Sequence, residues 1–169
     1  MKTESNPQIH PFPPIYDARS RVLVLGTFPS VKSREAGFYY AHPQNRFWRV
    51  LAYIFNEPPP ETVEAKRAFL LAHGVAVWDV LASCEITGSA DASIKNAEAN
   101  DIGSLLRETG IARVLTNGST AHSLYIKHVY PHTGVMPLAL PSTSPANASY
   151  SLERLVRAWR VALQKEGGA

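Results

Sequence analysis

The fold of this chain can be argued from the stretch Arg21-Val22-Leu23-Val24-Leu25-Gly26. An uninterrupted run of β-branched residues and leucines is typical of a strand that is buried on both faces, as in a parallel sheet. Similar apolar runs follow at Val75 to Leu81, Arg113 to Thr116 and Val135 to Leu140. We therefore expect a central sheet of mainly parallel strands.

Helical patterns lie between these strands. One helix begins after Asn45, because the apolar spacing i, i+3, i+4, i+7 is met by Phe47, Val50, Leu51 and Ile54. Further helices are expected within 61–73, 102–106, 119–128 and 152–163. Strands that alternate with helices predict an α/β domain with helices on both faces of the sheet.

The chain is predicted to form one domain with an N-terminal arm. Residues 1–20 are read as the arm, because the prolines between Pro7 and Pro14 disfavour regular structure there. Residues 21–166 are read as the single domain, which is long enough to bury a substantial core. Within it, the polar stretch Ala82 to Ala99 is expected to be a long irregular connection.

Composition excludes several classes of protein. No run approaches the roughly 20 apolar residues of a membrane span, and no signal peptide is present, so a cytoplasmic protein is expected. Cys84 is the only cysteine, which excludes disulfides and cysteine-based clusters and favours a small buried residue; no metal site is expected. The net charge of +3 and the pI of about 9.1 permit a polyanionic partner without demanding one.

The parallel sheet predicts where a ligand would bind. In such sheets the ligand site lies beyond the carboxyl ends of the strands. That rule makes neighbours of Gly26 to Ser30, Asp79 to Cys84, Asn117-Gly118 and Pro141 to Asn147.

The segment Gly37 to Trp48 combines aromatic and polar side chains. Flat rings can stack on a nucleobase, and Tyr39 and Tyr40 precede the predicted helix, so they are expected to be freer to face a ligand than Phe47, a core residue. Asn45 is either a helix N-cap or an amide that offers both a donor and an acceptor to a base edge.

Two loops offer weaker signals. The turn Gly26 to Ser30 is stiff and lacks the phosphate-loop pattern, so it is a structural turn or one wall of a site. The hydroxyl-rich loop Pro141 to Asn147 suits phosphate oxygens and is equally compatible with a plain connection.

The last helix carries a basic ridge of Arg154, Arg157 and Arg160, which is read as solvated surface. The residues alone indicate a polar, aromatic site that could take a base.

Three segments resemble the uracil-DNA glycosylase superfamily: Gly26 to Ser30, Gly37 to Trp48 and Leu140 to Asn147. The middle one is similar to the mismatch-specific uracil/thymine branch, and the similarity covers about Val22 to Leu163. This resemblance implies a three-layer α/β/α fold with a central four-stranded, mainly parallel sheet. It also implies hydrolysis of the N-glycosidic bond of a flipped-out base without a cofactor.

One residue departs from the superfamily pattern. Phe28 stands where many members have an Asp or Asn that handles the attacking water. An apolar residue there, together with Trp78-Asp79-Val80-Leu81 and the loop after Leu140, looks most like the hypoxanthine-DNA glycosylase branch. The resemblance therefore implies a DNA-deoxyinosine glycosylase, an enzyme of base-excision repair.

The resemblance also implies roles for single residues. Asn45 becomes the main catalytic candidate, since its amide can meet both O6 and N1–H of hypoxanthine, and Tyr40 is expected to stack on the base. Asp79 is a second candidate, for water or sugar contact, or else only a loop-capping carboxylate. The base pocket is expected to comprise Gly26, Thr27, Phe28, Pro29, Ser30, Phe38, Tyr40 and Asn117. DNA contacts are expected from Ser142, Thr143, Ser144, Pro145, Ala146 and Asn147.

The expected partner is DNA that contains a deaminated base, bound by a monomer without metal or other cofactor. Three alternatives stay open: a mismatch-specific uracil-DNA glycosylase, a non-catalytic domain that binds damaged or single-stranded DNA, and a hydrolase of free nucleosides. A purine that is protonated on its ring leaves as a neutral base, which lessens the need for a strong water base and is our hypothesis for why Phe28 is tolerated.

Overall fold

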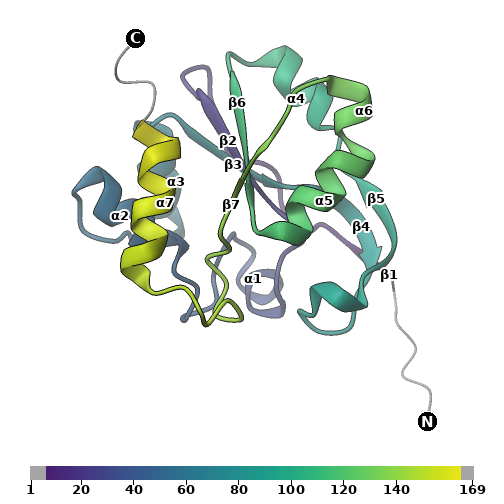
Figure 1. Ribbon diagram of the computed structural model, residues 1–169, viewed down its shortest axis with the longest axis horizontal. Helices are drawn as coiled ribbons and strands as arrows, with labels where there is room; N and C mark the ends of the chain where they lie inside the picture. Colours follow the sequence, from purple (N-terminus) through teal and green to yellow (C-terminus); the bar gives the residue numbers. More distant parts are fainter. Residues whose placement is uncertain (1–6, 165–169) are drawn as a thin grey trace.

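Four parallel strands form the centre of the computed structural model, which describes residues 7–164 (Figure 1). They lie in the order β3-β2-β6-β7, with bounds Val75–Asp79 for β3, Val22–Gly26 for β2, Arg113–Asn117 for β6 and Leu138–Leu140 for β7. All five residues of β2 are buried, and both its neighbours run parallel to it. The predicted four-stranded parallel sheet is therefore confirmed, with β3 ending earlier and β7 starting later than expected.

Helices cover both faces of this sheet (Figure 1). One layer comprises α2 (Phe47–Phe55), α3 (Val63–Ala72) and α7 (Leu152–Gln164), and the other α4 (Ile102–Glu108), α5 (Ser119–His128) and α6 (Tyr130–Thr133). Alternation along β2 separates the two cores: Val22 and Val24 pack with the first layer, and Leu23 and Leu25 with the second. The three-layer α/β/α prediction is confirmed.

A second sheet, which sequence patterns did not predict, lies beside the first. It has three antiparallel strands in the order β1-β4-β5, with bounds Pro7–Ile9 for β1, Leu81–Glu85 for β4 and Lys95–Ala99 for β5. The expected irregular connection at 82–99 is thus wrong: it holds two strands joined through a short 3-10 helix, η1 (Asp91–Ser93). The sequence pattern did not predict these strands, because β5 is largely exposed and the pairing of β4 with β5 shifts register twice.

The predicted N-terminal arm is part of the domain wherever the structure describes it. Ile15 is only 2% exposed and pairs with Val77 through two backbone hydrogen bonds of 2.9 and 3.0 Å. The separation at residue 20 is therefore wrong for residues 7–20. Prolines fix an extended backbone that an edge strand accepts, so they did not exclude pairing here. Residues 1–6 of the arm and the predicted domain end at 166 lie outside the described residues.

Local details also differ from the sequence expectations. A short helix that was not predicted, α1 (Val31–Ala36), follows β2 and is capped by Ser30, whose hydroxyl accepts from the Ser33 amide. The N-cap of α2 is Arg46 rather than Asn45. Cys84 is buried, as expected. Within residues 7–164, no helix is both long and apolar enough to cross a membrane.

Candidate active site

The carboxyl ends of the parallel strands surround a cavity of about 440 Å³, a size within the ordinary range of small-molecule sites. The structure brings together at this cavity most of the predicted site residues: Gly26, Thr27, Phe28, Pro29, Ser30, Tyr40, Asn45, Asp79, Asn117, Ser142, Thr143, Ser144, Pro145 and Ala146. Segments that are far apart in sequence meet here because parallel strands end at the same edge of the sheet.

Three aromatic or amide side chains make contacts within the protein that the sequence did not predict. Phe38 is absent from the cavity wall; it is 3% exposed and packs in the core, its ring stacked near Trp48. Tyr39 lines the cavity but is buried, and its hydroxyl is already engaged, since it donates to the carbonyl of Pro13 at 2.9 Å. Asn147 lies beside a neighbouring hollow, and its amide donates to the Ser142 carbonyl.

Gly26 permits the closest approach in the site. A Cβ atom on this residue would lie 2.4 Å from Asp79 Oδ1 and 3.0 Å from the Tyr40 hydroxyl oxygen. The turn after Gly26 is held against the link between β3 and β4, because the Val80 amide donates to the Gly26 carbonyl at 2.8 Å. The absence of a side chain at Gly26 therefore lets a carboxylate and a phenol converge over the backbone.

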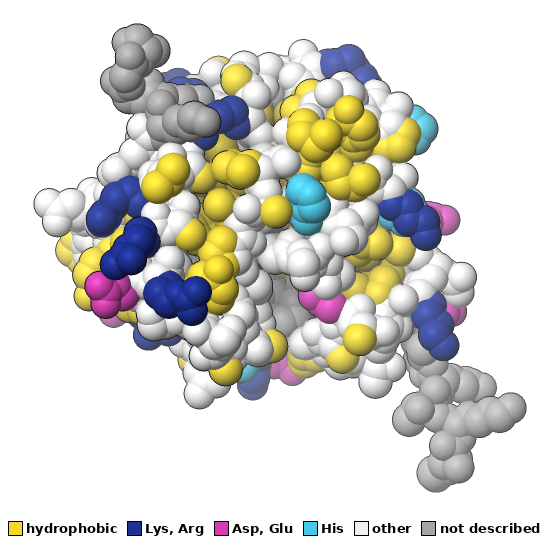
Figure 2. Space-filling view, in the orientation of Figure 1, with side chains coloured by type: hydrophobic (Ala, Val, Ile, Leu, Met, Phe, Trp, Pro, Cys, Tyr) yellow, Lys and Arg dark blue, Asp and Glu magenta, His cyan; other side chains and the backbone are white. Residues whose placement is uncertain are grey.

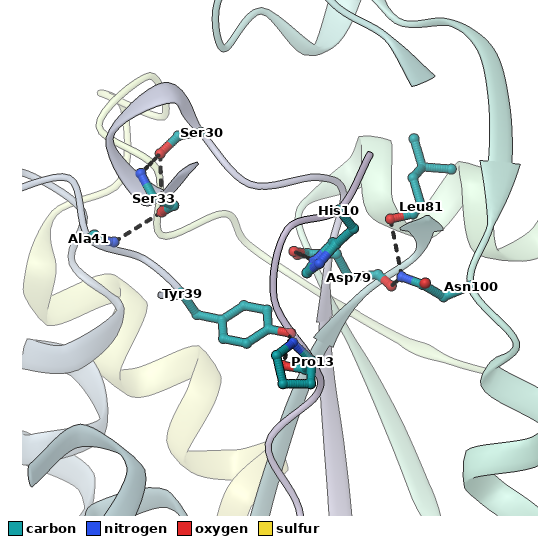
Figure 3. A network of polar contacts seen from close by, with 9 residues as sticks. All are labelled: His10, Pro13, Ser30, Ser33, Tyr39, Ala41, Asp79, Leu81 and Asn100. Atoms are coloured by element: carbon teal, nitrogen blue, oxygen red, sulfur yellow. Dashed lines mark hydrogen bonds and ion pairs between the residues drawn. The ribbon is translucent and has the colours of Figure 1, made fainter. Parts of the chain in front are cut away.

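Asp79 is paired with His10, a residue that sequence reasoning missed. The Nε2 atom of His10 lies 2.8 Å from Asp79 Oδ2, and both side chains are 5% exposed (Figure 3). The Asp79 backbone is held as well, since its carbonyl accepts from the Asn100 amide at 2.9 Å. No periodic pattern marked His10, which sits among prolines; only the tertiary pairing of β1 with β4 brings it to the site.

A chain of amide and hydroxyl contacts fixes Asn45. Its Oδ1 accepts from the Phe47 backbone amide and from the Thr143 hydroxyl, both at 2.9 Å. The Thr143 hydroxyl in turn accepts from the Asn117 amide, while Asn117 Oδ1 accepts from the Thr143 backbone amide, each at 3.0 Å. No described group takes a hydrogen bond from Asn45 Nδ2. The donor end of this amide is therefore the end that remains for a ligand.

Tyr40 adopts an uncommon backbone conformation at the cavity, with φ of 52°. Its ring stacks on Phe47 with the centroids 4.1 Å apart, and its carbonyl accepts from the Trp48 indole at 3.2 Å. Burial, and then the charge of Asp79, raises the pKa of Tyr40 far above its ordinary value. The hydroxyl therefore remains protonated and uncharged in neutral solution.

Phe28 forms an apolar part of the wall. It is 8% exposed, and its ring lies edge-on to His10 with centroids 6.0 Å apart and beneath the Arg34 guanidinium. A phenyl ring accepts no proton from water, so the turn after β2 cannot supply a general base at this position. One carboxylate of the cavity wall does approach this turn: Asp79, whose Oδ1 lies over Gly26.

The loop after β7 is held from inside by Arg46. Its guanidinium donates to the carbonyls of Ser144 and Asn147 at 3.0 Å, and also to that of Tyr150. Thr143 is 0% exposed, and its hydroxyl and backbone amide are used within the protein; its expected contact with DNA stays a prediction. Pro145 and Ala146 are exposed at the tip of the loop.

The basic ridge lies on the outer face of α7. Arg154, Arg157 and Arg160 are all exposed, and Lys and Arg side chains gather over this helix at the left of the space-filling view (Figure 2). Arg157 lies 3.7 Å from Glu153, and Arg154 lies over the Tyr150 ring at 4.2 Å. The ridge is solvated, as expected, and it is separate from the cavity.

Comparison with known proteins identifies the class to which this site belongs. The model of the Uracil DNA glycosylase superfamily matches residues 13–163, and the chain belongs to this superfamily. The match begins inside the segment that we expected to be an arm.

Individual relatives narrow the comparison. A hypoxanthine DNA glycosylase of Methanosarcina acetivorans is 30% identical over 145 residues, which cover 85% of this chain and 90% of the relative. A second protein of that name, from Methanosarcina barkeri, is 34% identical over 110 residues, or 63% and 69% of the two chains. The solution NMR structure of a Methanosarcina acetivorans protein, provisionally described as a uracil DNA glycosylase, superposes with a TM-score of 0.78 at 29% identity, covering 91% and 95%.

Proposed function

We propose that this protein is a monofunctional DNA glycosylase that hydrolyses the N-glycosidic bond of a deaminated base in DNA, with hypoxanthine as the preferred base. Two relatives that carry the name hypoxanthine DNA glycosylase support this substrate. We also propose that the enzyme is cytoplasmic and monomeric. Size-exclusion chromatography with light scattering tests the monomeric state.

The orientation of Asn45 is the observation that carries the proposal. The sequence suggested that the Asn45 amide meets both O6 and N1–H of a base. It cannot do so, because its Oδ1 already accepts from Phe47 and Thr143. It presents two N–H donors to the cavity instead. Donors aimed at a departing base stabilise the electron density that the base gains as the glycosidic bond breaks.

The absence of a water-activating group at Phe28 is consistent with excision of a purine. Phe28 offers no acceptor, and a purine that takes a ring proton from solvent water departs as a neutral molecule. Neutral departure lowers the demand on a general base. A flipped base also costs less to extract when it is mispaired, as hypoxanthine is in several contexts, and this contributes selectivity.

The test is a panel of DNA duplexes that each carry one inosine, uracil or xanthine. Excess protein is incubated with each duplex, and alkaline scission reveals abasic sites. We expect scission at inosine first, and a loss of about 100-fold or more for Asn45→Ala, since removal of one transition-state donor costs that much in other enzymes. Met136→Leu, at a side chain that is 64% exposed, serves as the matched control and should keep full activity.

Other patterns in the same panel identify the alternatives. Preference for uracil supports a mismatch-specific uracil-DNA glycosylase, which the Gly37 to Trp48 segment resembles. Binding without scission at any lesion supports a non-catalytic domain. Release of hypoxanthine from free inosine, with little dependence on salt, supports a nucleoside hydrolase, because DNA binding weakens steeply as salt rises.

A further inference from the structure

Asp79 lines the cavity although it is only 3% exposed, so its carboxylate lies deep in the site. One oxygen, Oδ2, is taken by His10. The other, Oδ1, rests over Gly26, where a Cβ atom would collide with it at 2.4 Å. Because a carboxylate only accepts hydrogen bonds, Oδ1 presents a fixed acceptor at this point of the wall.

His10 sets the position of that acceptor. Its ring packs against Phe12, Tyr39 and Phe28, with centroid separations of 4.8, 5.8 and 6.0 Å. Its backbone amide donates to the Ala82 carbonyl at 2.7 Å. The imidazole is thus immobilised by an aromatic box and by β4, and its Nε2–H can donate only toward the carboxylate that it faces.

Deamination changes one feature that an acceptor in this position detects. In adenine the N1 atom is an acceptor, whereas in hypoxanthine it carries a hydrogen and donates. The same change occurs at N3 when cytosine becomes uracil. A buried carboxylate gains a charge-assisted hydrogen bond from each deaminated base, and it opposes a lone pair in each parent base.

We propose that Asp79, held by His10, recognises the ring N–H group that deamination creates. Asp79 is then the residue that determines specificity, and His10 is a positioning residue that acts through it. This inference rests on the proposed function and assigns Asp79 to the base, whereas the sequence suggested contact with water or sugar.

The probe is a base that lacks the donor at ring position 1. In 1-deazahypoxanthine a C–H group replaces N1–H with nearly unchanged shape, and the oxo form carries its ring hydrogen on N3, away from this edge of the base. Both bases are placed in duplexes on 2′-fluorinated sugars, which resist cleavage, and dissociation constants are measured. For the unmodified protein we expect the deaza base to bind on the order of 10- to 100-fold more weakly, as for loss of a hydrogen bond to a charged group.

Two variants test the pair. In Asp79→Asn the His10 Nε2–H holds the amide oxygen, so the variant turns an N–H group toward the base. We expect the ratio between the two dissociation constants to fall close to one, and the preference for hypoxanthine over adenine to narrow. His10→Leu should also lower the ratio, whereas His10→Gln, which keeps a donor near the same place, should retain it.

Phe12→Leu is the matched packing control, because it alters the aromatic box without changing the donor to Asp79. It should leave the ratio as it is in the unmodified protein, which a merely structural role of His10 would not predict. Circular dichroism and thermal unfolding show which variants are folded.

The outcomes separate this inference from the proposed function. If the unmodified protein excises hypoxanthine and discriminates against the deaza base, but Asp79→Asn keeps the full ratio, the inference fails and the proposed function stands. A variant that excises more slowly with an unchanged ratio assigns Asp79 to water or sugar and also overturns the inference. Absence of scission at every lesion refutes both.

Discussion

The Thr143 hydroxyl donates a hydrogen bond to Asn45 Oδ1 at 2.9 Å, joining two residues that are 98 positions apart. Both residues also contact the ends of further elements: Asn45 accepts from the first residue of α2, and Thr143 is bonded to Asn117 at the end of β6. The orientation of the proposed catalytic amide is therefore set by a residue that is itself fully buried.

Thr143→Val removes this hydroxyl while keeping the shape of the side chain. We expect excision to slow by about tenfold, because Asn45 loses one of the two donors that orient it. We also expect the free energy of unfolding to fall by about 1–3 kcal/mol, since the Asn117 amide is left without its acceptor. Single-turnover kinetics and urea unfolding measure the two effects. Thr143→Ser, which keeps the hydroxyl, should excise at nearly the original rate; equal losses in both variants would contradict this explanation.

Arg46→Lys tests the loop that follows β7. A guanidinium holds three carbonyls of this loop at once, and an ammonium group cannot reproduce its planar geometry. We expect faster amide hydrogen exchange in residues 144–150 and weaker binding to duplex DNA, by about tenfold. Arg49→Lys, on the exposed side of α2, is the matched control. Unchanged exchange in Arg46→Lys would show that the loop is held by other contacts.

Phe28→Asn tests whether the turn after β2 has kept a role in handling water. The substitution places an amide in an apolar wall, so we expect a loss of about 2–4 kcal/mol in stability and no gain in excision rate. Phe28→Leu keeps the wall apolar and should retain activity. Faster excision by Phe28→Asn would mean that the attacking water lies beside this turn, contrary to our assignment of Phe28 to an apolar wall that does not handle water.

Stability should decline at high pH because of Tyr39. Burial, and then the charge of Asp79, raises the pKa of Tyr39 above its ordinary value of 10.0. As pH rises past about 10, the unfolded chain releases this proton and the folded chain keeps it, so the unfolded state is favoured. Below that pH the stability contribution is fully present. Tyr40, whose pKa is also raised, should act in the same direction.

Tyr39→Phe separates this effect from packing. At neutral pH the variant should be less stable by about 1 kcal/mol, because it lacks the hydrogen bond to Pro13. Above about pH 10 its stability should fall less steeply than that of the unmodified protein. Urea unfolding at a series of pH values measures both. Tyr53→Phe, at a 62% exposed position, is the control, and an identical slope for Tyr39→Phe would refute the assignment.

Much of the central fold was predictable because burial on both faces leaves a direct mark on sequence. The run at Val22 to Leu25 is fully buried, as its unbroken apolar character indicates. The carboxyl-end rule then located the cavity, since it depends only on strand direction. Edge strands leave a weaker mark, because their exposed residues tolerate prolines and polar side chains; β1 and β5 were therefore missed.

By itself, the sequence determined the α/β class, the parallel sheet and the loops that meet at its edge, because these follow from local periodicity and strand direction. Only the tertiary structure decided which side chains reach the cavity. It placed Phe38 in the core and buried Thr143 behind Asn45. It also brought His10 to Asp79 across 69 residues. Contacts of this kind depend on how distant segments pack, and neither composition nor spacing along the chain encodes them.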